Sequence, residues 1–105
     1  MSRSIRDFCK QHAKWSQETF GLDSERGPIG ALKHLAKEAQ EAQNDPTDII
    51  EYADCLFLTI DAARRAGFSW RQLLDAAFQK LAINKTRTWP KPTKSDEPIE
   101  HVREI

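Results

Sequence analysis

Residues 37–54 read KEAQEAQNDPTDIIEYAD, and two acidic pairs in this stretch decide what the chain can fold into. Glu38 and Glu41 form the first pair, and Glu51 and Asp54 form the second. Side chains three residues apart lie on the same face of an α-helix, about 5–6 Å apart at Cβ. Carboxylates held that close repel one another unless a cation neutralises them. The stretch therefore predicts two helices that hold a divalent metal ion between them.

A break in the helical pattern separates the two pairs. Asn44-Asp45-Pro46 is typical of a helix end, and we expect Asp45 to cap the following helix with Pro46 at its first position. A tight turn at this point makes the two helices antiparallel neighbours. The acidic faces can then meet in an open site of four carboxylates, which suits Mg²⁺ together with water or phosphate ligands.

The rest of the chain has the same helical periodicity, which predicts an all-α fold. We expect one domain, residues 1–105, built as a four-helix bundle with an extended tail over residues 88–105. The expected helix ends are Ser4 and Gly21 for the first helix, Pro28 for the start of the second, Gly67 for the end of the third, and a capping box at Ser69 for the fourth. The residues expected to face the core include Ile29 and Leu32, Ile49 and Leu56, and Leu74, Phe78 and Leu81.

The composition is that of a globular protein, with 39% hydrophobic and 30% charged residues. No run of about 18 apolar residues could span a membrane, and the first residues show no apolar signal region. We therefore expect a cytoplasmic protein without a membrane partner. Cys9 and Cys55 fall inside helical patterns and are expected to be reduced, mostly buried thiols, because a zinc site needs more Cys and His ligands.

Charge is distributed in blocks, although the net charge is zero. Residues 38–63 hold seven acidic and no basic side chains, whereas residues 64–94 hold eight basic side chains and one acidic. This order suits a metal–polyphosphate ligand, because acids hold the metal and bases hold phosphate oxygens. Ordinary helix surface charge can give the same distribution. Nucleic acid is not an expected partner, since its binders more often have a net basic balance.

The fourth helix carries the candidate phosphate contacts. Lys80, Asn84 and Arg87 are spaced by four and three residues, so they stack on one helix face. The alternative is a solvated face without a function. In the tail, His101 and Arg103 are further candidates that can close over a nucleotide, in the same subunit or in a neighbouring one.

Three other residues each have two interpretations. Asp61 lies two turns after Asp54 on the same face, and it is either a further metal or sugar ligand or a solvated acid. His34 lies one turn before the first acidic pair, and it is either a contact to substrate or to a metal ligand, or a partly exposed histidine. Trp15, together with Phe20, either stacks on a nucleobase or belongs to the core.

In combination, these motifs resemble the MazG-type all-α nucleoside triphosphate pyrophosphohydrolases. The resemblance is carried by the order of Glu38-x-x-Glu41, Glu51-x-x-Asp54 and Lys80-x-x-x-Asn84-x-x-Arg87. Many MazG-type proteins begin the first motif with two adjacent Glu residues, whereas Lys37 stands here, so the number of metal ions stays open. The flanking segments are similar to the small dATP/dGTP pyrophosphohydrolases of bacteria and phages; they are Trp15-Ser16-x-x-Thr19-Phe20-Gly21, residues 27–38, residues 61–67 and Trp89-Pro90.

The resemblance implies Mg²⁺-dependent hydrolysis of a purine nucleoside triphosphate, dGTP or dATP, to the monophosphate and pyrophosphate. The four acids of the two pairs would hold Mg²⁺, with Mn²⁺ as a substitute, and metal-activated water would attack the α-phosphorus. Lys80 and Arg87 would stabilise charge on the phosphoryl oxygens, and Asn84 would bond a sugar hydroxyl or a phosphate. It also implies a homo-oligomer, either a dimer or a tetramer built from dimers.

Two alternatives remain open at this point. One is a pyrophosphohydrolase for another nucleotide on the same scaffold, such as dUTP, dCTP or phosphoribosyl-ATP. The other is a small helical interaction module without enzymatic activity, in which the acids are surface charge.

Overall fold

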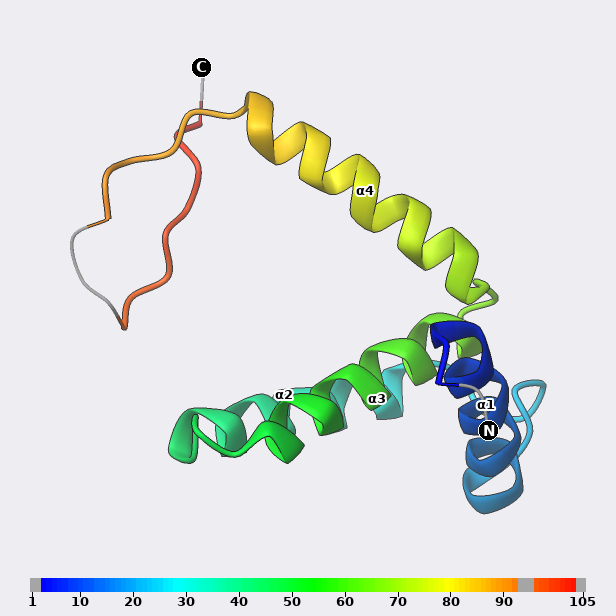
Figure 1. The fold of residues 1–105 in the computed structure, drawn as a ribbon. Helices are drawn as coiled ribbons and strands as arrows, with labels where there is room; N and C mark the ends of the chain where they lie inside the picture. Colours follow the sequence, from blue (N-terminus) through cyan, green and yellow to red (C-terminus); the bar gives the residue numbers. More distant parts are fainter. Residues whose placement is uncertain (1–2, 93–95, 104–105) are drawn as a thin grey trace. The chain divides into compact units, whose positions relative to one another are not determined.

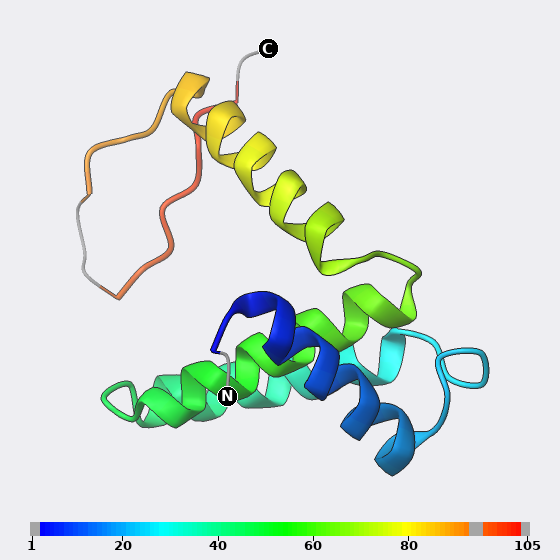
Figure 2. The same cartoon turned by 45° about the vertical axis from the view of Figure 1, so that its right-hand side comes forward.

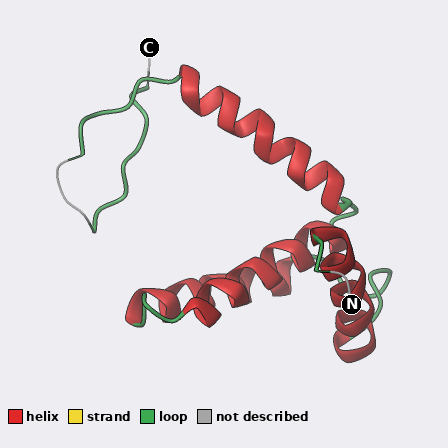
Figure 3. Ribbon diagram, viewed as in Figure 1, coloured by secondary structure: helices red, strands yellow, loops and turns green. Residues whose placement is uncertain are grey.

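The computed structural model describes residues 3–92 and 96–103, and within these ranges it contains four α-helices and no β-strand (Figures 1 and 3). The helices are α1 (Ile5–Phe20), α2 (Ile29–Asn44), α3 (Ile49–Arg65) and α4 (Trp70–Thr86). The all-α prediction is confirmed. The described residues fall into two compact units, one that extends to Leu73 and one that begins at Leu74.

Both ends of α1 have the residues that the sequence predicts. The Ser4 side chain accepts a hydrogen bond from the backbone N–H of Asp7, which satisfies one of the unpaired donors of the first turn. At the other end, Gly21 takes φ 112°, a conformation that side-chain-bearing residues rarely adopt. Its N–H donates to the carbonyl of Gln17, and the chain then leaves the helix.

The turn between α2 and α3 differs from the expected one. Asp45 follows the last residue of α2 as its C-cap, and Asp48 caps α3 by accepting a hydrogen bond from the N–H of Ile50 at 2.9 Å. Pro46 is not at the first position of α3. It lies inside a turn closed by the N–H of Asp48 and the carbonyl of Asp45, where its fixed φ suits the second turn position. The prediction that Asp45 and Pro46 begin α3 is therefore wrong, because a second aspartate was available closer to the helix.

The connection from α3 to α4 confirms two predicted end signals. Gly67 has φ 98°, and the N–H groups of Gly67 and Phe68 donate to the carbonyls of Arg64 and Ala63, which is a Schellman arrangement. Ser69 and Gln72 then form the reciprocal capping box. The Ser69 hydroxyl accepts from the N–H of Gln72, and the Gln72 side chain accepts from the N–H of Ser69.

In the first unit, α2 and α3 form an antiparallel hairpin, and α1 packs against α3 (Figures 1 and 2). The contact between α1 and α3 lies in the C-terminal half of α3. There the rings of Phe8 and Phe57 meet edge to face, with 5.3 Å between centroids, and Ser16 bonds Asp61. This arrangement leaves the acidic N-terminal half of α3 to face α2.

Few of the described residues are buried, and more than half of these are polar. The buried residues are Cys9, Ile60 and Ala62 among the apolar ones, and His12, Ser16, Asp61 and Arg65 among the polar ones. Among the described residues, no helix combines the length and the apolar composition needed to cross a membrane.

The predicted apolar stripes are mostly exposed in the single chain. Ile49 is 77% exposed, Phe78 is 64% exposed and Ile29 is 61% exposed, and neither α2 nor α4 has a buried residue among those described. The expectation that these stripes face a core is therefore wrong within each unit taken alone. Their large apolar side chains lie on the surface of the described residues.

The second unit contains α4 from Leu74 onward and the tail that follows it. The N–H of Val102 donates to the carbonyl of Thr88 at 2.6 Å, and the indole N–H of Trp89 donates to the carbonyl of Asn84 at 2.7 Å. The Trp89 ring also meets the His101 ring edge to face, with 5.8 Å between centroids. These contacts hold the tail against the C-terminal end of α4.

Candidate metal and nucleotide site

The hairpin of α2 and α3 brings the predicted acidic pairs together. Glu38 and Glu41 from α2 and Glu51 from α3 each offer a carboxylate oxygen, and these three oxygens all lie within 4.8 Å of one another. Asp54 is one turn further along α3, and it lines a cavity together with Glu38. Three of the four predicted ligands therefore form one group, and the fourth lies beside it.

The electrostatics of Glu38 are those of a carboxylate among carboxylates. Its pKa is raised above the ordinary value, first by a side-chain hydrogen bond with Glu41, then by burial and by the negative charges of Glu41 and Asp54. His34 acts in the opposite direction, because its Nε2 lies 3.0 Å from Oε1 of Glu38. The structure thus places His34 against a predicted metal ligand, while leaving its side chain 58% exposed.

The pKa of Glu51 is also raised, but its largest cause differs from that at Glu38. Burial raises its pKa first, followed by the charges of Glu41, Asp48, Asp54 and Glu38. One carboxylate oxygen of Glu51 and one of Glu38 are buried and have no hydrogen-bond partner among the described residues. Buried oxygens without partners are costly. A hard divalent cation such as Mg²⁺ or Mn²⁺, which prefers carboxylate oxygens, fits this set of donors.

A cavity of about 260 Å³ adjoins the acidic group and is lined by residues of α1, α2 and α3. α2 contributes His34 and Glu38, and α3 contributes Asp54. The rest of the wall is formed by His12, Trp15, Ser16, Phe20, Phe57, Leu58 and Asp61. The wall of the cavity thus combines carboxylates with aromatic rings.

The aromatic wall is arranged mainly edge to face. The ring centroids of Trp15 and Phe20 are 5.4 Å apart at an interplanar angle of 89°, and those of His12 and Phe57 are 4.5 Å apart at 71°. Trp15 is 51% exposed, so it belongs to the cavity wall rather than to the core. A half-exposed aromatic surface beside a polar site can accept the flat face of a nucleobase.

His12 adds a polar group to this wall. Its side chain is 5% exposed, and its Nδ1 has no hydrogen-bond partner among the described residues. Burial lowers the pKa of His12, the charge of Asp61 acts against this, and Arg64 and Arg65 lower the pKa further. The neutral imidazole that results has one donor and one acceptor nitrogen.

Asp61 is buried rather than solvated, and both of its oxygens are bonded within the protein. Oδ1 accepts from the Ser16 hydroxyl and from Nη2 of Arg64, both at 2.6 Å, and Oδ2 accepts from Nε of Arg65 at 3.2 Å. Burial alone would raise the pKa of Asp61, but these hydrogen bonds and the charge of Arg64 outweigh it and lower the pKa. Asp61 therefore joins α1 to α3 at the wall of the cavity.

The two arginines extend this network to the end of α1. Arg65 donates to the Ser16 hydroxyl at 3.0 Å and to the carbonyl of Gly21 at 3.1 Å, and its side chain is 1% exposed. Arg64 donates from Nε to Asp23 at 3.0 Å. The network fixes the α1 segment that carries Trp15 and the chain just beyond Phe20.

The remaining predicted contacts lie in the second unit. Lys80 is exposed, whereas Asn84 and Arg87 are half-buried, and Nη1 of Arg87 donates to Oδ1 of Asn84 at 3.3 Å. Lys80 and Asn84 lie in α4, whereas Arg87 follows its last residue, Thr86, so the prediction that all three share one helix face is wrong for Arg87.

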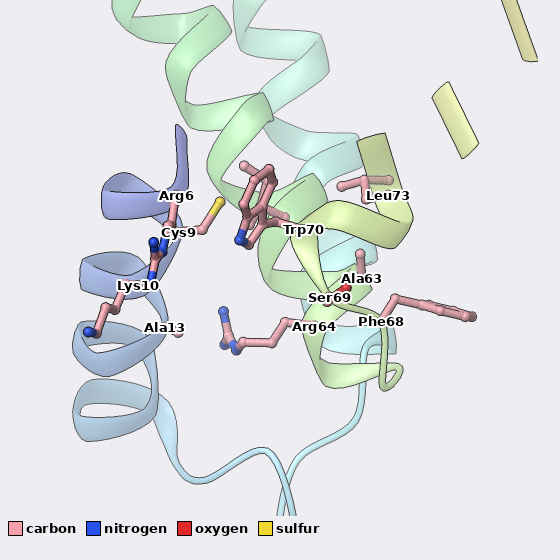
Figure 4. Close-up of a pocket in the computed structure, with 11 residues that line it drawn as sticks. Arg6, Cys9, Lys10, Ala13, Ala63, Arg64, Phe68, Ser69, Trp70 and Leu73 are labelled. Atoms are coloured by element: carbon pink, nitrogen blue, oxygen red, sulfur yellow. The ribbon is translucent and has the colours of Figure 1, made fainter. Parts of the chain in front are cut away.

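A second cavity of the first unit, of about 350 Å³, lies on a different face of α1 (Figure 4). Its wall includes Arg6, Cys9, Arg64, Phe68 and Trp70. Burial raises the pKa of the Cys9 thiol, with the charge of Arg64 acting against it. Both cysteines are free thiols, and Cys9 is buried as expected, whereas Cys55 is half-buried. None of the predicted site residues lines this cavity.

Sequence reasoning missed His12, Ser16 and Phe57 as parts of the site. They reach the cavity through the crossing of α1 over α3, which no local spacing reveals. The partners of Asp61 had a local signal, since arginines three and four residues after an acid on a helix predict ion pairs.

The fold of the chain resembles that of a solved structure. A cyanophage S-2L MazG-like pyrophosphohydrolase, solved with dGDP and three catalytic Mn²⁺ ions per active site, matches with a TM-score of 0.73 and 26% identity. The match covers 97% of this chain and 100% of that one. The fold and the acidic hairpin together define a MazG-like pyrophosphohydrolase.

Comparisons at the sequence level narrow the class. The family model of dATP/dGTP pyrophosphohydrolase matches residues 8–105, so the chain belongs to this family. The dATP/dGTP diphosphohydrolase of cyanophage S-2L is 31% identical over 91 residues, which is 85% of this chain and 81% of that protein. The Eaa protein of Salmonella phage P22 is 52% identical over 95 residues. That match covers 90% of this chain but 29% of the Eaa protein, so the chain spans less than a third of that relative.

Proposed function

We propose that the chain hydrolyses a purine deoxynucleoside triphosphate, dGTP or dATP, to the monophosphate and pyrophosphate in a reaction that requires Mg²⁺. The observation that carries the proposal is the group of three carboxylates, two of which have a buried oxygen without a partner, at the mouth of an aromatic cavity. The family match and the S-2L neighbour with dGDP and Mn²⁺ support it.

The acids of the hairpin are the proposed metal-binding and catalytic residues: Glu38, Glu41, Glu51 and Asp54. Bound metal ions would neutralise phosphate oxygens and lower the pKa of a water molecule. In the reaction, water attacks the α-phosphorus, and the bond from this phosphorus to the bridging oxygen breaks, so that pyrophosphate leaves. One of the four carboxylates takes the proton that the water loses.

The aromatic wall is the proposed base site. Trp15 offers a half-exposed ring face, and His12 offers a buried nitrogen without a partner to the edge of the base. His34, which contacts Glu38, is proposed to orient this ligand or to touch the substrate. The sugar contact first considered for Asp61 competes with its three internal hydrogen bonds, so we assign Asp61 to positioning the wall.

For the phosphates we propose Lys80 and Arg87 as the cations, with Asn84 bonding a sugar hydroxyl or a phosphate oxygen. Stabilising charge on phosphoryl oxygens is the main task in phosphoryl transfer, and guanidinium groups match phosphate geometry.

Release of pyrophosphate from a panel of nucleotides, with and without EDTA, tests the proposal. We expect metal-dependent release from dGTP or dATP that exceeds release from dUTP, dCTP and phosphoribosyl-ATP. Metal-independent release, or none from any triphosphate, would refute it. Calorimetric titration with Mg²⁺ separates the enzyme from a helical interaction module, because surface acids would bind the ion very weakly.

We also propose that the chain self-associates in the cytoplasm, as a dimer or as a tetramer built from dimers. The exposed apolar stripes of α2, α3 and α4 support this, since a monomer seldom leaves so many large apolar side chains in water. Light scattering at micromolar concentration is the measurement, and a monomeric mass contradicts the proposal.

A further inference from the structure

The second unit contains a polar cavity of about 400 Å³ where the tail meets the end of α4. Two guanidinium groups, one imidazole and two hydroxyl groups are available around it, and no carboxylate is among the described residues that line it. The lining residues are Thr86, Arg87, Thr88, His101, Val102 and Arg103.

The cavity is built by contacts that bring together residues distant in sequence. The backbone bond from Val102 to Thr88 fixes the tail segment between His101 and Arg103 against the chain that leaves α4. Trp89 reinforces this contact, because its indole N–H bonds the last turns of α4 while its ring packs on His101. The cationic groups therefore line one cavity because tertiary contacts hold them there, and not only because they are neighbours on a helix surface.

Among the described residues of the second unit, no ion pair compensates the charge of this cavity. Arg87 is half-buried, and its guanidinium donates to the neutral amide of Asn84. Arg103 has no ion pair among those found in the described residues. Two guanidinium groups on one small cavity repel each other, and a doubly or triply charged oxyanion would remove the repulsion. The planar fork of arginine matches phosphate oxygens in geometry as well as in charge.

We propose that Arg87, His101 and Arg103 form a phosphate-binding site at the junction of α4 and the tail. Its ligand is a phosphate group, either of a nucleotide or of free pyrophosphate. The site goes beyond the proposed function by giving the tail a ligand, and the nucleotide case rests on that function. Arg87 is shared with the proposed substrate contacts, whereas His101 and Arg103, which the sequence suggested only as residues that close over a nucleotide, are here given a phosphate as their ligand.

The first test measures binding without catalysis. The full chain in EDTA is titrated with pyrophosphate at low ionic strength by calorimetry, so that the metal site cannot contribute. We expect wild type to bind, and we expect H101Q and R103Q to weaken binding about tenfold or more, as loss of a charged hydrogen bond predicts. R103K, which keeps the charge and loses the fork, should fall between wild type and R103Q.

Lys85→Gln is the matched control, since Lys85 is an exposed cation on the same helix that does not line the cavity. It should bind pyrophosphate within about twofold of wild type, with the small change due to screened charge alone. Equal losses in K85Q and R103Q would mean general attraction to a basic surface and would overturn the proposal. Absence of wild-type binding would overturn it as well.

Steady-state kinetics with dGTP and Mg²⁺ then distinguishes the two sources of phosphate. If the site holds the nucleotide's own phosphates, R103Q raises KM about tenfold. If it holds free pyrophosphate, KM stays unchanged and inhibition by added pyrophosphate weakens instead. Either result supports the site. If the wild-type protein turned over no triphosphate, that would count against the proposed function alone, because the binding test in EDTA does not depend on turnover.

Discussion

The two halves of α3 hold carboxylates in opposite states. In the N-terminal half, Glu51 faces other acids, has a buried oxygen without a partner, and has a raised pKa. In the C-terminal half, Asp61 receives hydrogen bonds from Ser16 and two arginines, and its pKa is lowered. The first arrangement costs stability until a cation arrives, whereas the second is complete within the chain. The contrast separates acids that serve a ligand from acids that serve the fold.

The largest expected effect is on stability, in the C-terminal half of α3, where Asp61 has all its hydrogen bonds within the chain. The Arg65 side chain is 1% exposed and donates to Asp61, to the Ser16 hydroxyl and to the Gly21 carbonyl. Arg65→Met removes all of these bonds at a buried position, so we expect a loss of about 3–5 kcal/mol in the free energy of unfolding, measured by urea denaturation. Arg64→Met is the matched comparison and should cost less, because the Arg64 side chain is 18% exposed. Equal denaturation midpoints for wild type and R65M would show that the network does not stabilise the fold.

In the N-terminal half of α3, where Glu51 has a buried oxygen without a partner among the described residues, we expect a large effect on activity without a loss of stability. Glu51→Gln removes a charge from the acidic group, so turnover should fall by more than the roughly 100-fold that mutation of residues supporting a metal ligand can cost. The metal-free protein should be as stable as wild type or more so, because one repulsion is gone.

Asp45→Asn is the control for this variant, because Asp45 is an exposed acid of the turn outside the group. It should retain the activity of wild type. An E51Q variant that turns over at the full rate would remove Glu51 from the site, and an E51Q variant that unfolds would assign it to the fold instead.

The same contrast explains what the sequence could predict. Spacing placed Glu38 and Glu41 on one face, and end signals such as Gly67 and the Ser69 box placed the helix ends, because both depend on neighbours within one turn. The crossing of α1 over α3 depends on contacts between distant residues. The buried position of Ser16 and the cavity wall at His12 could therefore not be predicted from spacing.

The prediction that the apolar stripes face a core was wrong for a related reason. Periodicity shows that a helix has an apolar face, but it does not show whether that face meets the same chain or another one. Ile49 and Phe78 have the correct phase for a core and are nevertheless exposed in the single chain.

The pH dependence of stability should show both halves at once. The raised pKa values of Glu38 and Glu51 mean that the folded state binds protons more tightly there, so metal-free stability should fall as pH rises above about 4.3 through those values. The lowered pKa of Asp61 has the opposite sign, and its contribution should be lost as pH falls below about 3.9.

Denaturation across pH 3–8, about the range that spans these values, with and without Mn²⁺, measures both effects. Added Mn²⁺ should remove the fall at higher pH, because it binds the ionised acids of the folded state. In E51Q that fall should be smaller even without metal. A profile that is the same in wild type and E51Q would contradict the raised pKa of Glu51.

The smallest expected effect concerns Asp48, which both stabilises the fold as a helix cap and adds negative charge near the acidic group. Its side chain caps α3, and its charge contributes to the raised pKa of Glu51. Asp48→Ala removes the cap and the charge together, so the loss of about 1 kcal/mol from the cap should be partly offset by the relieved repulsion. Asp48→Asn keeps a good cap and removes only the charge, so its stability should equal or slightly exceed that of wild type. NMR titration of the Glu51 carboxyl carbon should show a lower pKa in both variants. If the pKa of Glu51 falls in D48A but not in D48N, the structure of the helix end, rather than the charge of Asp48, sets this pKa. In that case burial contributes more than charge repulsion to the raised pKa of Glu51 in the N-terminal half of α3.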